Sequence, residues 1–356
     1  MKILFWVPYP SEGASNRYRV EQYLPYLKKE GIEYMLRPFW SSFAFKILYE
    51  KGYYFRKIYY VILGTIGRFI DVVFLFKYDL VFIHREAYPI GSVFFETILT
   101  LLRKPFIFDF DDAIFLSSIS PSNNFIINYK KPQKVAEIIK RCNYVIAGNK
   151  YLADFALNYN HFVSVVPTPI DTDKYRAKAD RNEDKITIGW IGSITTLNFL
   201  NSMSNVFIQL TKQFPDIQFK VVGGKFSVDG LTNIISKPWS IDEELEDLRT
   251  FDIGIMPMPD NKWTRGKCGF KAIVYMCMGI PCICSPVGFN SEIIINGVNG
   301  FLADMDNEWI DRLSLLIKDS ELRKRIGYAA RTIVEEKYSV KANIVKFLEV
   351  LTSVKK

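Results

Sequence analysis

The sequence is poor in the residues that build metal centres and disulfide frameworks. Its 356 residues include 2 histidines and 5 cysteines, and no Cys-x-x-Cys pair occurs. Zinc sites need such ligands at short spacings, so the pattern argues against a bound metal. We expect buried, reduced thiols, which suit a cytoplasmic protein, at Cys142, Cys268, Cys277, Cys282 and Cys284.

Two other signals are missing. There is no Gly-x-Gly-x-x-Gly, the turn that binds the pyrophosphate of a dinucleotide, so an oxidoreductase is disfavoured. The first apolar run, Lys2–Val7, is too short for a signal peptide and is expected to form a strand. Hydrophobic residues make up 49% of the chain, which predicts a folded protein without disordered segments.

Acidic residues are outnumbered, with 38 Asp and Glu against 46 Lys and Arg. The densest basic part, residues 42–77, interleaves cations with aromatic and aliphatic residues, a mixture typical of helices lying on an anionic membrane surface. Buried helices are an open alternative. A membrane span is disfavoured because Gly64, Gly67, Arg68 and Asp71 interrupt the apolar stretch. No nucleic-acid-binding motif accompanies the charge, so nucleic acid is not an expected partner.

Short apolar runs alternate with longer helical patterns, which predicts parallel sheets covered by helices. Since the length exceeds what one core usually supports, we expect two Rossmann-like α/β domains facing each other across a cleft. Pro167, Pro169 and a polar segment mark the break. The predicted domains are residues 1–170 and 171–339, with a last helix at about 340–356 packing back onto the first domain.

The first domain has five predicted strands: Lys2–Val7, Leu80–His84, Pro105–Asp109, Tyr144–Ala147 and Val163–Val166. The second has four, with a further short strand expected near Phe301: Lys185–Ile191, Phe219–Val222, Asp252–Met256 and Pro281–Ser285. Its predicted helices are Leu197–Phe214, Asp242–Thr250, Phe270–Met278, Trp309–Lys318 and Ser320–Lys337.

Two glycine-containing basic segments of the second domain are candidates for binding phosphate. Gly192 and Ser193 follow a predicted strand, where backbone N–H groups at the start of the next helix can bind an anion. A tight turn without a ligand is the alternative. Arg265, Lys267 and Lys271 lie on a loop and first helical turn, where the helix dipole disfavours cations unless an anion neutralises them. A solvated basic loop remains open.

Further polar groups follow other strands. Asn290, Ser291 and Glu292 form a turn that could bind hydroxyls of a ligand. In the first domain, three strands are followed by charged segments with Gly13, Arg17 and Arg19, then His84, Arg85 and Glu86, then Asp109, Asp111 and Asp112. We expect an acceptor site there, although His84 could be a buried histidine with a satisfied partner and the aspartates could cap helices or turns. Metal binding by Asp109 and Asp111 is a weaker alternative.

These motifs together resemble the GT-B glycosyltransferases of family four, which retain anomeric configuration and need no metal. The resemblance covers nearly the whole chain and is strongest from Gly189-Trp-Ile-Gly-Ser193 to Phe301. It implies that the second domain binds a UDP- or GDP-linked sugar as co-substrate and that no other cofactor is needed. It also implies that His84 lies near the transferred sugar, and that Lys267 and Lys271 stabilise the leaving diphosphate.

One departure from the family pattern concerns the donor site. Members usually carry two glutamates eight positions apart, the second of which holds the ribose, and Gly266 and Val274 occupy the matching positions here. The chain resembles a branch with Gly-Lys-Cys-Gly-Phe-Lys at this place. The expected reaction is sugar transfer to a glycan or lipid-linked acceptor in bacterial cell-surface polysaccharide synthesis. A nucleotide-sugar epimerase and a non-catalytic sugar-binding subunit are the alternatives, and the sequence names neither the sugar nor the oligomeric state.

Overall fold

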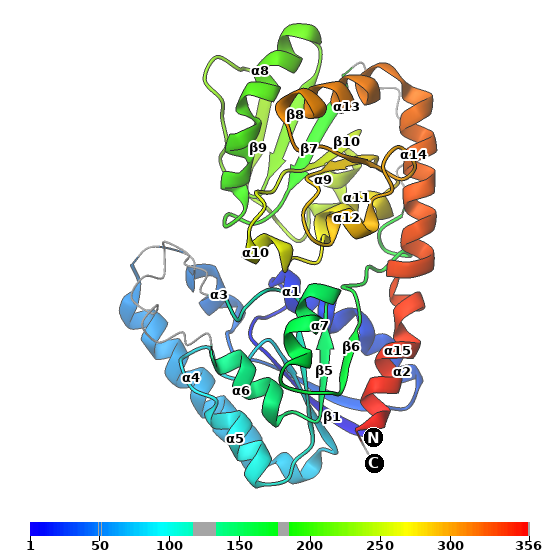
Figure 1. Cartoon of the computed structure of the whole chain (residues 1–356). Coiled ribbons are helices and arrows are strands. Elements are labelled where there is room, and N and C mark those ends of the chain that lie inside the picture. The colour runs from blue at the N-terminus through cyan, green and yellow to red at the C-terminus, as the bar shows by residue number, and fades with distance from the viewer. Residues whose placement is uncertain (49, 51, 117–132, 177–184, 355–356) are drawn as a thin grey trace. The chain divides into compact units, whose positions relative to one another are not determined.

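The computed structural model describes residues 1–48, 50, 52–116, 133–176 and 185–354 (Figure 1). The chain divides into two compact units. Unit 1 comprises Met1–Pro169 and Asn343–Lys356, and unit 2 comprises Ile170–Ala342. Each contains a six-stranded sheet whose strand pairs are all parallel. Both units therefore have the Rossmann-like architecture expected from the alternating pattern.

The sheet of unit 1 has the order β2-β1-β3-β4-β5-β6. Its strands are β1 (Lys2–Val7), β2 (Glu33–Pro38), β3 (Leu80–His84), β4 (Phe106–Phe110), β5 (Tyr144–Ala147) and β6 (Val163–Val165). The central strands β3 and β4 are buried along their whole length, as expected for strands covered on both faces.

The helices of unit 1 include one long element, α4 (Tyr54–Val73). Two buried polar side chains fix it to the sheet: the Arg68 guanidinium donates to the Val7 carbonyl (3.1 Å), and Asp71 accepts from Trp6 Nε1 (3.0 Å). The remaining helices are α1 (Ala14–Arg19), α2 (Leu24–Lys29), α3 (Ser42–Leu48), α5 (Phe94–Leu101), α6 (Gln133–Arg141) and α7 (Lys150–Leu157), with short 3-10 helices at Glu21–Tyr23 and Leu75–Lys77.

The sheet of unit 2 has the order β12-β11-β10-β7-β8-β9. Its strands are β7 (Thr187–Ile191), β8 (Gln218–Val222), β9 (Ile234–Lys237), β10 (Ile253–Met256), β11 (Cys282–Cys284) and β12 (Phe301–Leu302). Its helical elements are a 3-10 helix (Leu197–Met203), α8 (Ser204–Gln213), α9 (Glu244–Arg249), α10 (Lys262–Arg265), α11 (Phe270–Cys277), α12 (Asn290–Ile293), α13 (Asp306–Lys318), α14 (Ser320–Ile333) and a π-helical turn (Val334–Tyr338). Helix α15 (Val340–Ser353) starts in unit 2 and ends in unit 1.

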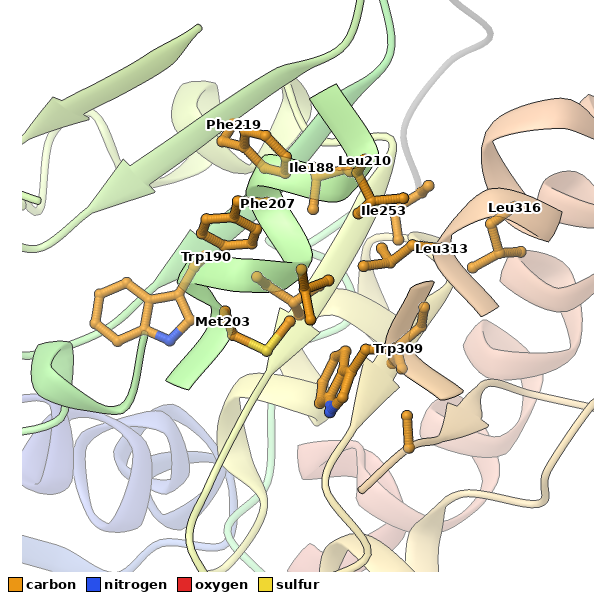
Figure 2. Packing of buried hydrophobic residues seen from close by; sticks show 14 of the residues in the cluster. Ile188, Trp190, Met203, Phe207, Leu210, Phe219, Ile253, Trp309, Leu313 and Leu316 are labelled. Carbon is orange, nitrogen blue, oxygen red and sulfur yellow. The ribbon is translucent and has the colours of Figure 1, made fainter. Parts of the chain in front are cut away.

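The core of unit 2 forms where α8 and α13 cover the sheet (Figure 2). Phe207 of α8 stacks on Phe219 of β8 with ring centroids 4.2 Å apart, and Leu313 of α13 is fully buried in the same cluster. A side chain at Gly189 would collide with the Phe251 ring, because an added Cβ would lie 2.1 Å from it. The central strand β7 therefore needs glycine at this position.

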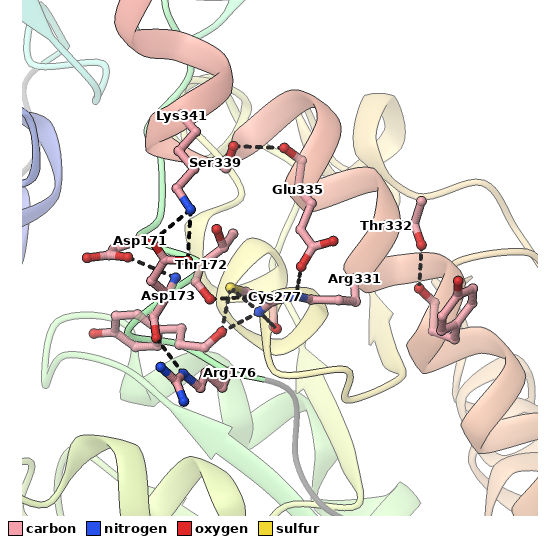
Figure 3. Close-up of polar contacts among 12 residues, drawn as sticks. Asp171, Thr172, Asp173, Arg176, Cys277, Arg331, Thr332, Glu335, Ser339 and Lys341 are labelled. Atoms are coloured by element: carbon pink, nitrogen blue, oxygen red, sulfur yellow. Dashed lines mark hydrogen bonds and ion pairs between the residues drawn. The ribbon is translucent and has the colours of Figure 1, made fainter. Parts of the chain in front are cut away.

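Arg331 of α14 joins the segments where the chain enters and leaves unit 2 (Figure 3). Its guanidinium donates to the backbone carbonyls of Thr172 (2.8 Å), Tyr175 and Cys277, and its Nε pairs with Glu335 at 2.6 Å. Residues Ile170 and Ser339 form an isolated parallel bridge nearby. The contacts close unit 2 around its own two chain ends.

The structure corrects several expectations drawn from the sequence. The predicted helix Leu197–Phe214 is a 3-10 helix followed by α8, so no α-helix begins directly after Gly192 and Ser193. Strands β2 and β9 were not predicted. The predicted helix Ser320–Lys337 ends at Ile333 and continues as a π-helical turn. All five cysteines are buried and free, and burial raises the pKa of Cys142 and of Cys277 to about 12.

Candidate functional site

Lys271 lies in the first turn of α11 and points to the end of β7. Its Nζ donates to Thr196 Oγ1 at 3.0 Å and lies 4.6 Å from the centroid of the Trp190 ring. The lysine stem also fills the space that a side chain at Gly192 would need, because an added Cβ there would lie 2.5 Å from Lys271 Cε. Glycine at 192 thus makes room for the lysine.

The surroundings of Lys271 disfavour its charge. Burial removes water from the ammonium, and Lys267 repels it, so the pKa of Lys271 falls from its ordinary value of 10.5 to about 7. Its two contacts, a hydroxyl and an aromatic ring, carry no opposite charge. An anion bound beside Lys271 would supply the missing charge and raise its pKa again.

The backbone beside Lys271 is tightly packed. Gly223 follows β8 with φ +137°, and a Cβ there would lie 2.0 Å from the Gly192 carbonyl oxygen. Gly192 N–H donates to the Val222 carbonyl at 2.9 Å. Ser193 Oγ bonds with Thr195 Oγ1 at 2.7 Å in the exposed turn that follows. The glycines therefore place two strand ends against each other next to the lysine.

The other two cations of the predicted phosphate loop have different surroundings. Lys267 Nζ lies 3.7 Å from the centroid of the Trp263 ring. Arg265 is about half exposed and makes a two-pronged ion pair with Asp260, at 2.6 and 2.8 Å. Lys271 thus donates a hydrogen bond to Thr196 beside the glycine turn, whereas Arg265 pairs with Asp260 of its own loop.

The predicted turn at 290–292 divides into buried and exposed parts. Asn290 is fully buried, and its Nδ2 donates to the Ser285 carbonyl at 3.2 Å. Ser291 and Glu292 are exposed. Gly288, with φ +53°, brings the turn against the backbone of Arg265. Asn290 thus holds the turn in shape, while Ser291 and Glu292 lie on its exposed side.

In unit 1, His84 and Asp109 are opposite one another at the ends of β3 and β4. His84 Nδ1 lies 2.6 Å from Asp109 Oδ2, and Arg19 forms an ion pair with the same carboxylate. All three side chains are buried. Burial alone would raise the pKa of Asp109, but Arg19 and the hydrogen bond from His84 outweigh it and hold the pKa below its ordinary value. Asp109 is therefore a buried carboxylate that orients His84.

A second carboxylate stands on the other side of His84. Ser15 Oγ lies 2.5 Å from His84 Nε2 and donates to Asp111 Oδ2 at 3.1 Å. Arg85 pairs with Asp111 at 2.7 Å and with Asp112 at 3.6 Å. Burial would raise the pKa of Asp111, but Arg85 lowers it well below its ordinary value. Arg85 has φ +61°, a left-handed conformation that is strained for a residue with a side chain and is often found at functional sites.

Three predicted residues of unit 1 have contacts of a different kind. Gly13 precedes α1, where an added Cβ would lie 2.5 Å from Tyr9 Cβ. Arg17 is buried, donates to Tyr18 Oη and stacks on that ring. Glu86 pairs with Lys134 of α6 at 2.9 Å. The structure thus gathers Arg19, His84, Arg85, Asp109 and Asp111 into one cluster, with Asp112 at its margin.

Sequence reasoning missed Ser15, Thr196 and Trp190. Ser15 lies in the segment that was singled out for its arginines, and its hydroxyl is the group closest to His84 Nε2 among the contacts described. Thr196 and Trp190 flank the glycine turn and hold Lys271. The residue types Ser, Thr and Trp alone do not indicate a binding site. Their positions at the ends of predicted strands were the signal that could have identified them. Among the described residues, no group of three or more His, Cys, Asp or Glu could hold a metal ion.

A recess of about 300 Å³ lies elsewhere in unit 1, between β2 and α4. Its charged lining residues are Arg37, Arg68 and Asp71, and both arginines pair with the aspartate. Burial lowers the pKa of Arg68 to about 10. We interpret the recess as part of the junction that fixes α4 to the sheet.

Comparison with known proteins identifies a segment of unit 2 that matches a family model. Residues 253–333, which include Lys267, Lys271 and the turn at 285–292, match the model of the glycosyl transferases group 1. An uncharacterized glycosyltransferase of Methanocaldococcus jannaschii is 23% identical over 237 residues, or 60% of this chain. The match spans 59% of that relative's length.

Solved structures resemble the chain over its full length. Anabaena HepE, in complex with UDP and glucose, has a TM-score of 0.68 and 15% identity, covering 99% of this chain and 100% of its own. A glycosyltransferase from Rickettsia africae scores 0.68 at 16% identity, covering 100% and 98%. Sucrose-phosphate synthase from Thermosynechococcus elongatus scores 0.71 at 13% identity, covering 99% of each chain. The chain thus has the two-domain GT-B fold of glycosyltransferases, and its residues 253–333 match the group 1 model.

Proposed function

We propose that the protein is a glycosyltransferase that moves a sugar from a UDP- or GDP-linked donor to a glycan or lipid-linked acceptor. We further propose that transfer retains the anomeric configuration, needs no metal ion and serves bacterial cell-surface polysaccharide synthesis. The observation that carries the proposal is the half-buried Lys271, which lies beside the glycine turn after β7 without a negative partner in its contacts. It falls inside the segment that matches the group 1 model.

A diphosphate is the ligand that this arrangement suits. The ends of parallel strands are where Rossmann-like domains bind nucleotides, and Lys271 extends from α11 toward the end of β7. A bound diphosphate would restore the charge that burial takes from the lysine. UDP is the first nucleotide to test, because Anabaena HepE was crystallised with UDP and with UDP-glucose.

The proposed reaction is a front-side displacement. The bond between the anomeric carbon and the diphosphate oxygen breaks, and the acceptor oxygen bonds to that carbon on the same face. The acceptor proton passes to the departing phosphate, so no protein carboxylate is needed as a nucleophile. Negative charge grows on the leaving group, where Lys271, Lys267 and the amide of Ser193 would stabilise it. The Gly192 amide, which the sequence also suggested, instead donates to the Val222 carbonyl within the sheet.

We assign the cluster around His84 to the sugar and acceptor side of the reaction. Asp109 and Arg19 fix the ring of His84, while Ser15 and Asp111 face its Nε2. Such fixed polar groups suit binding of sugar hydroxyls. Ribose recognition differs from the usual family pattern, because Gly266 has no side chain and Val274 is buried in α11. That departure favours a non-catalytic sugar-binding subunit as the second candidate function.

Thermal unfolding with nucleotides tests the donor site. UDP or GDP at about 100 times its dissociation constant should stabilise the protein by about 2.7 kcal/mol, in EDTA as well as in its absence. A stabilisation that EDTA abolishes and manganese restores would contradict metal independence. Incubation with nucleotide sugars, with and without an acceptor, separates the alternatives. An epimerase would convert the nucleotide sugar without any acceptor, and a non-catalytic binding subunit would convert it under neither condition.

Substituting Lys271 tests catalysis. Lys271→Met keeps the apolar stem beside Trp190 and removes the ammonium, so turnover should fall about 100- to 1,000-fold while the unliganded protein stays folded. Lys262→Met, at an exposed lysine of α10, is the matched control and should retain near-normal transfer. Equal activity of the two variants in a transfer assay would show that the assigned role is wrong.

A further inference from the structure

Helix α4 buries charged side chains and exposes apolar ones. The side chains that it buries are Lys57, Arg68 and Asp71, and each of the first two has polar partners: Lys57 Nζ donates to the Glu50 carbonyl at 2.6 Å, and Arg68 to the carbonyls of Val7, Arg37 and Ala87. A helix on the surface of a water-soluble domain normally buries its apolar stripe. Here that stripe points outward.

The exposed side of α4 carries apolar residues three and four positions apart along its whole length of about 30 Å. Phe55 is 91% exposed and Val73 is 68% exposed. Between them lie Ile58, Tyr59, Ile62, Leu63, Ile66, Phe69 and Ile70, all exposed. The spacing keeps them on one face of the helix.

The apolar surface continues onto α5, which lies beside α4 (Figure 1). Phe69 of α4 contacts Phe94 of α5 with ring centroids 5.8 Å apart, and Leu101 and Leu102 are exposed at the end of α5. We call the exposed apolar residues of α4 and α5, together with Phe74 and Phe76, the docking face. So long a continuous apolar face marks an interaction site rather than ordinary surface.

Within residues 53–78 the exposed charged side chains at the edge of the docking face are both positive, and the exposed carboxylates Glu50 and Asp79 lie just outside this range. The exposed charged side chains there are Arg56 and Lys77, since Lys57, Arg68 and Asp71 are buried. Lys77 Nζ lies 4.5 Å from the Phe74 ring centroid, and Arg56 lies 5.7 Å from that of Tyr53. Arg103, after α5, is also exposed. Cations next to aromatic rings are typical of the interface between water and lipid.

We propose that the docking face lies in the surface of an anionic lipid bilayer, with α4 parallel to the membrane. No helix among the described residues is long and apolar enough to cross a bilayer, so α4 would enter one leaflet only. Charge favours lipid over a second copy of the chain as the occupant. A two-fold axis perpendicular to α4 would bring Arg56 against Lys77 of the other copy. A two-fold axis along α4 would bring Arg56 against Arg56 of the other copy. In both arrangements like charges would repel.

Sedimentation with vesicles tests the apolar part of the docking face. The full chain should bind phosphatidylcholine vesicles that contain phosphatidylglycerol. Replacing Phe55, Ile62 and Ile66 together by Gln should lower the partition coefficient at least about tenfold, since their burial in lipid is lost. The matched control replaces Phe162 and Tyr328, which are 64% and 78% exposed outside this face, by Gln and should bind normally. No sedimentation of the wild type, or equal binding of the triple variant, would overturn the proposal.

The charged edge needs a second comparison. Arg56→Gln with Lys77→Gln should weaken binding to phosphatidylglycerol-containing vesicles about tenfold or more and change binding to pure phosphatidylcholine little. Equal effects on both lipids would contradict an anionic surface. Sedimentation velocity checks the rival occupant: a dimer that the triple Gln variant abolishes, in a protein that ignores vesicles, would assign the face to a second copy.

The result is separable from the proposed transfer reaction. All five substituted positions, three on the docking face and two at its edge, are exposed, so circular dichroism and stabilisation by UDP should be unchanged in the variants. Loss of both vesicle binding and nucleotide response would show a folding defect rather than a docking face. Loss of vesicle binding alone supports the proposal, whether or not the protein transfers sugar.

Discussion

At the scale of single residues, the candidate sites depend on partners that position in the sequence does not reveal. Lys267, Lys271 and Arg265 are neighbours in the sequence, yet one stacks on Trp263, one reaches Thr196, and one pairs with Asp260. The sequence predicted that a basic loop follows β10, because glycines and cations are local signals. Which cation lies beside the glycine turn depends on tertiary contacts, which no local pattern encodes.

The low pKa of Lys271 makes stability depend on pH in a definite direction. The unfolded chain keeps this lysine protonated up to its ordinary pKa of 10.5, whereas the folded chain loses the proton near pH 7. Between those values the unfolded state binds more protons, so the free energy of unfolding rises with pH. Relative to Lys271→Met, wild type should gain about 2 kcal/mol between pH 7 and pH 9.

Urea unfolding at pH 7, 8 and 9 measures this difference. The Met variant cancels the contributions of all other titrating groups, because they are shared. Parallel stability curves for wild type and Lys271→Met would mean that the ammonium is well hydrated. Saturating UDP should reduce the pH dependence of the free energy of unfolding of the wild type, since a bound anion keeps Lys271 charged.

At the scale of elements, the buried strands were predicted, whereas two of the four edge strands, β2 and β9, were missed. Strand β3 is a continuous apolar run and was predicted as Leu80–His84, the range observed. The edge strands β2 and β9 alternate between partly buried and exposed side chains and include Glu33 and Lys237, so their composition resembles a loop. Helix α4 was open to two interpretations, because its buried cations and exposed apolar residues reverse the usual pattern.

Arg331 gives a prediction about how elements are joined in unit 2. Arg331→Met removes the donors to three backbone carbonyls and leaves those carbonyls without this partner. The cost should be about 2 to 4 kcal/mol of unfolding free energy, since each buried group left unsatisfied costs about 1 to 3 kcal/mol. Arg325→Met is the control, because Arg325 is exposed on the same helix. Chemical denaturation should separate the two variants, and similar losses would mean that the Arg331 contacts contribute little.

At the scale of the whole molecule, the chain consists of two units with separate hydrophobic cores. Unit 1 is completed by the end of α15, from Asn343 to Ser353, which follows unit 2 in the sequence. Phe347 is 2% exposed and stacks on Tyr23 at 4.1 Å. A helix packing back onto the first domain was predicted from the amphipathic pattern at the end of the chain. How the two units face each other stays a prediction.

Separate cores predict separate responses to substitution and to ligand. Phe347→Ala should lower the free energy of unfolding of unit 1 by about 3 to 5 kcal/mol. Leu316 is a fully buried residue of α13, and Leu316→Ala should lower the free energy of unfolding of unit 2 by about 2 to 5 kcal/mol. Scanning calorimetry with UDP then assigns the donor site. The proposed phosphate ligands all lie in unit 2. UDP should therefore raise the transition temperature of unit 2, which Leu316→Ala lowers, and should not change that of unit 1, which Phe347→Ala lowers. If UDP instead raises the transition sensitive to Phe347→Ala, the donor belongs to unit 1 and Lys271 serves another purpose.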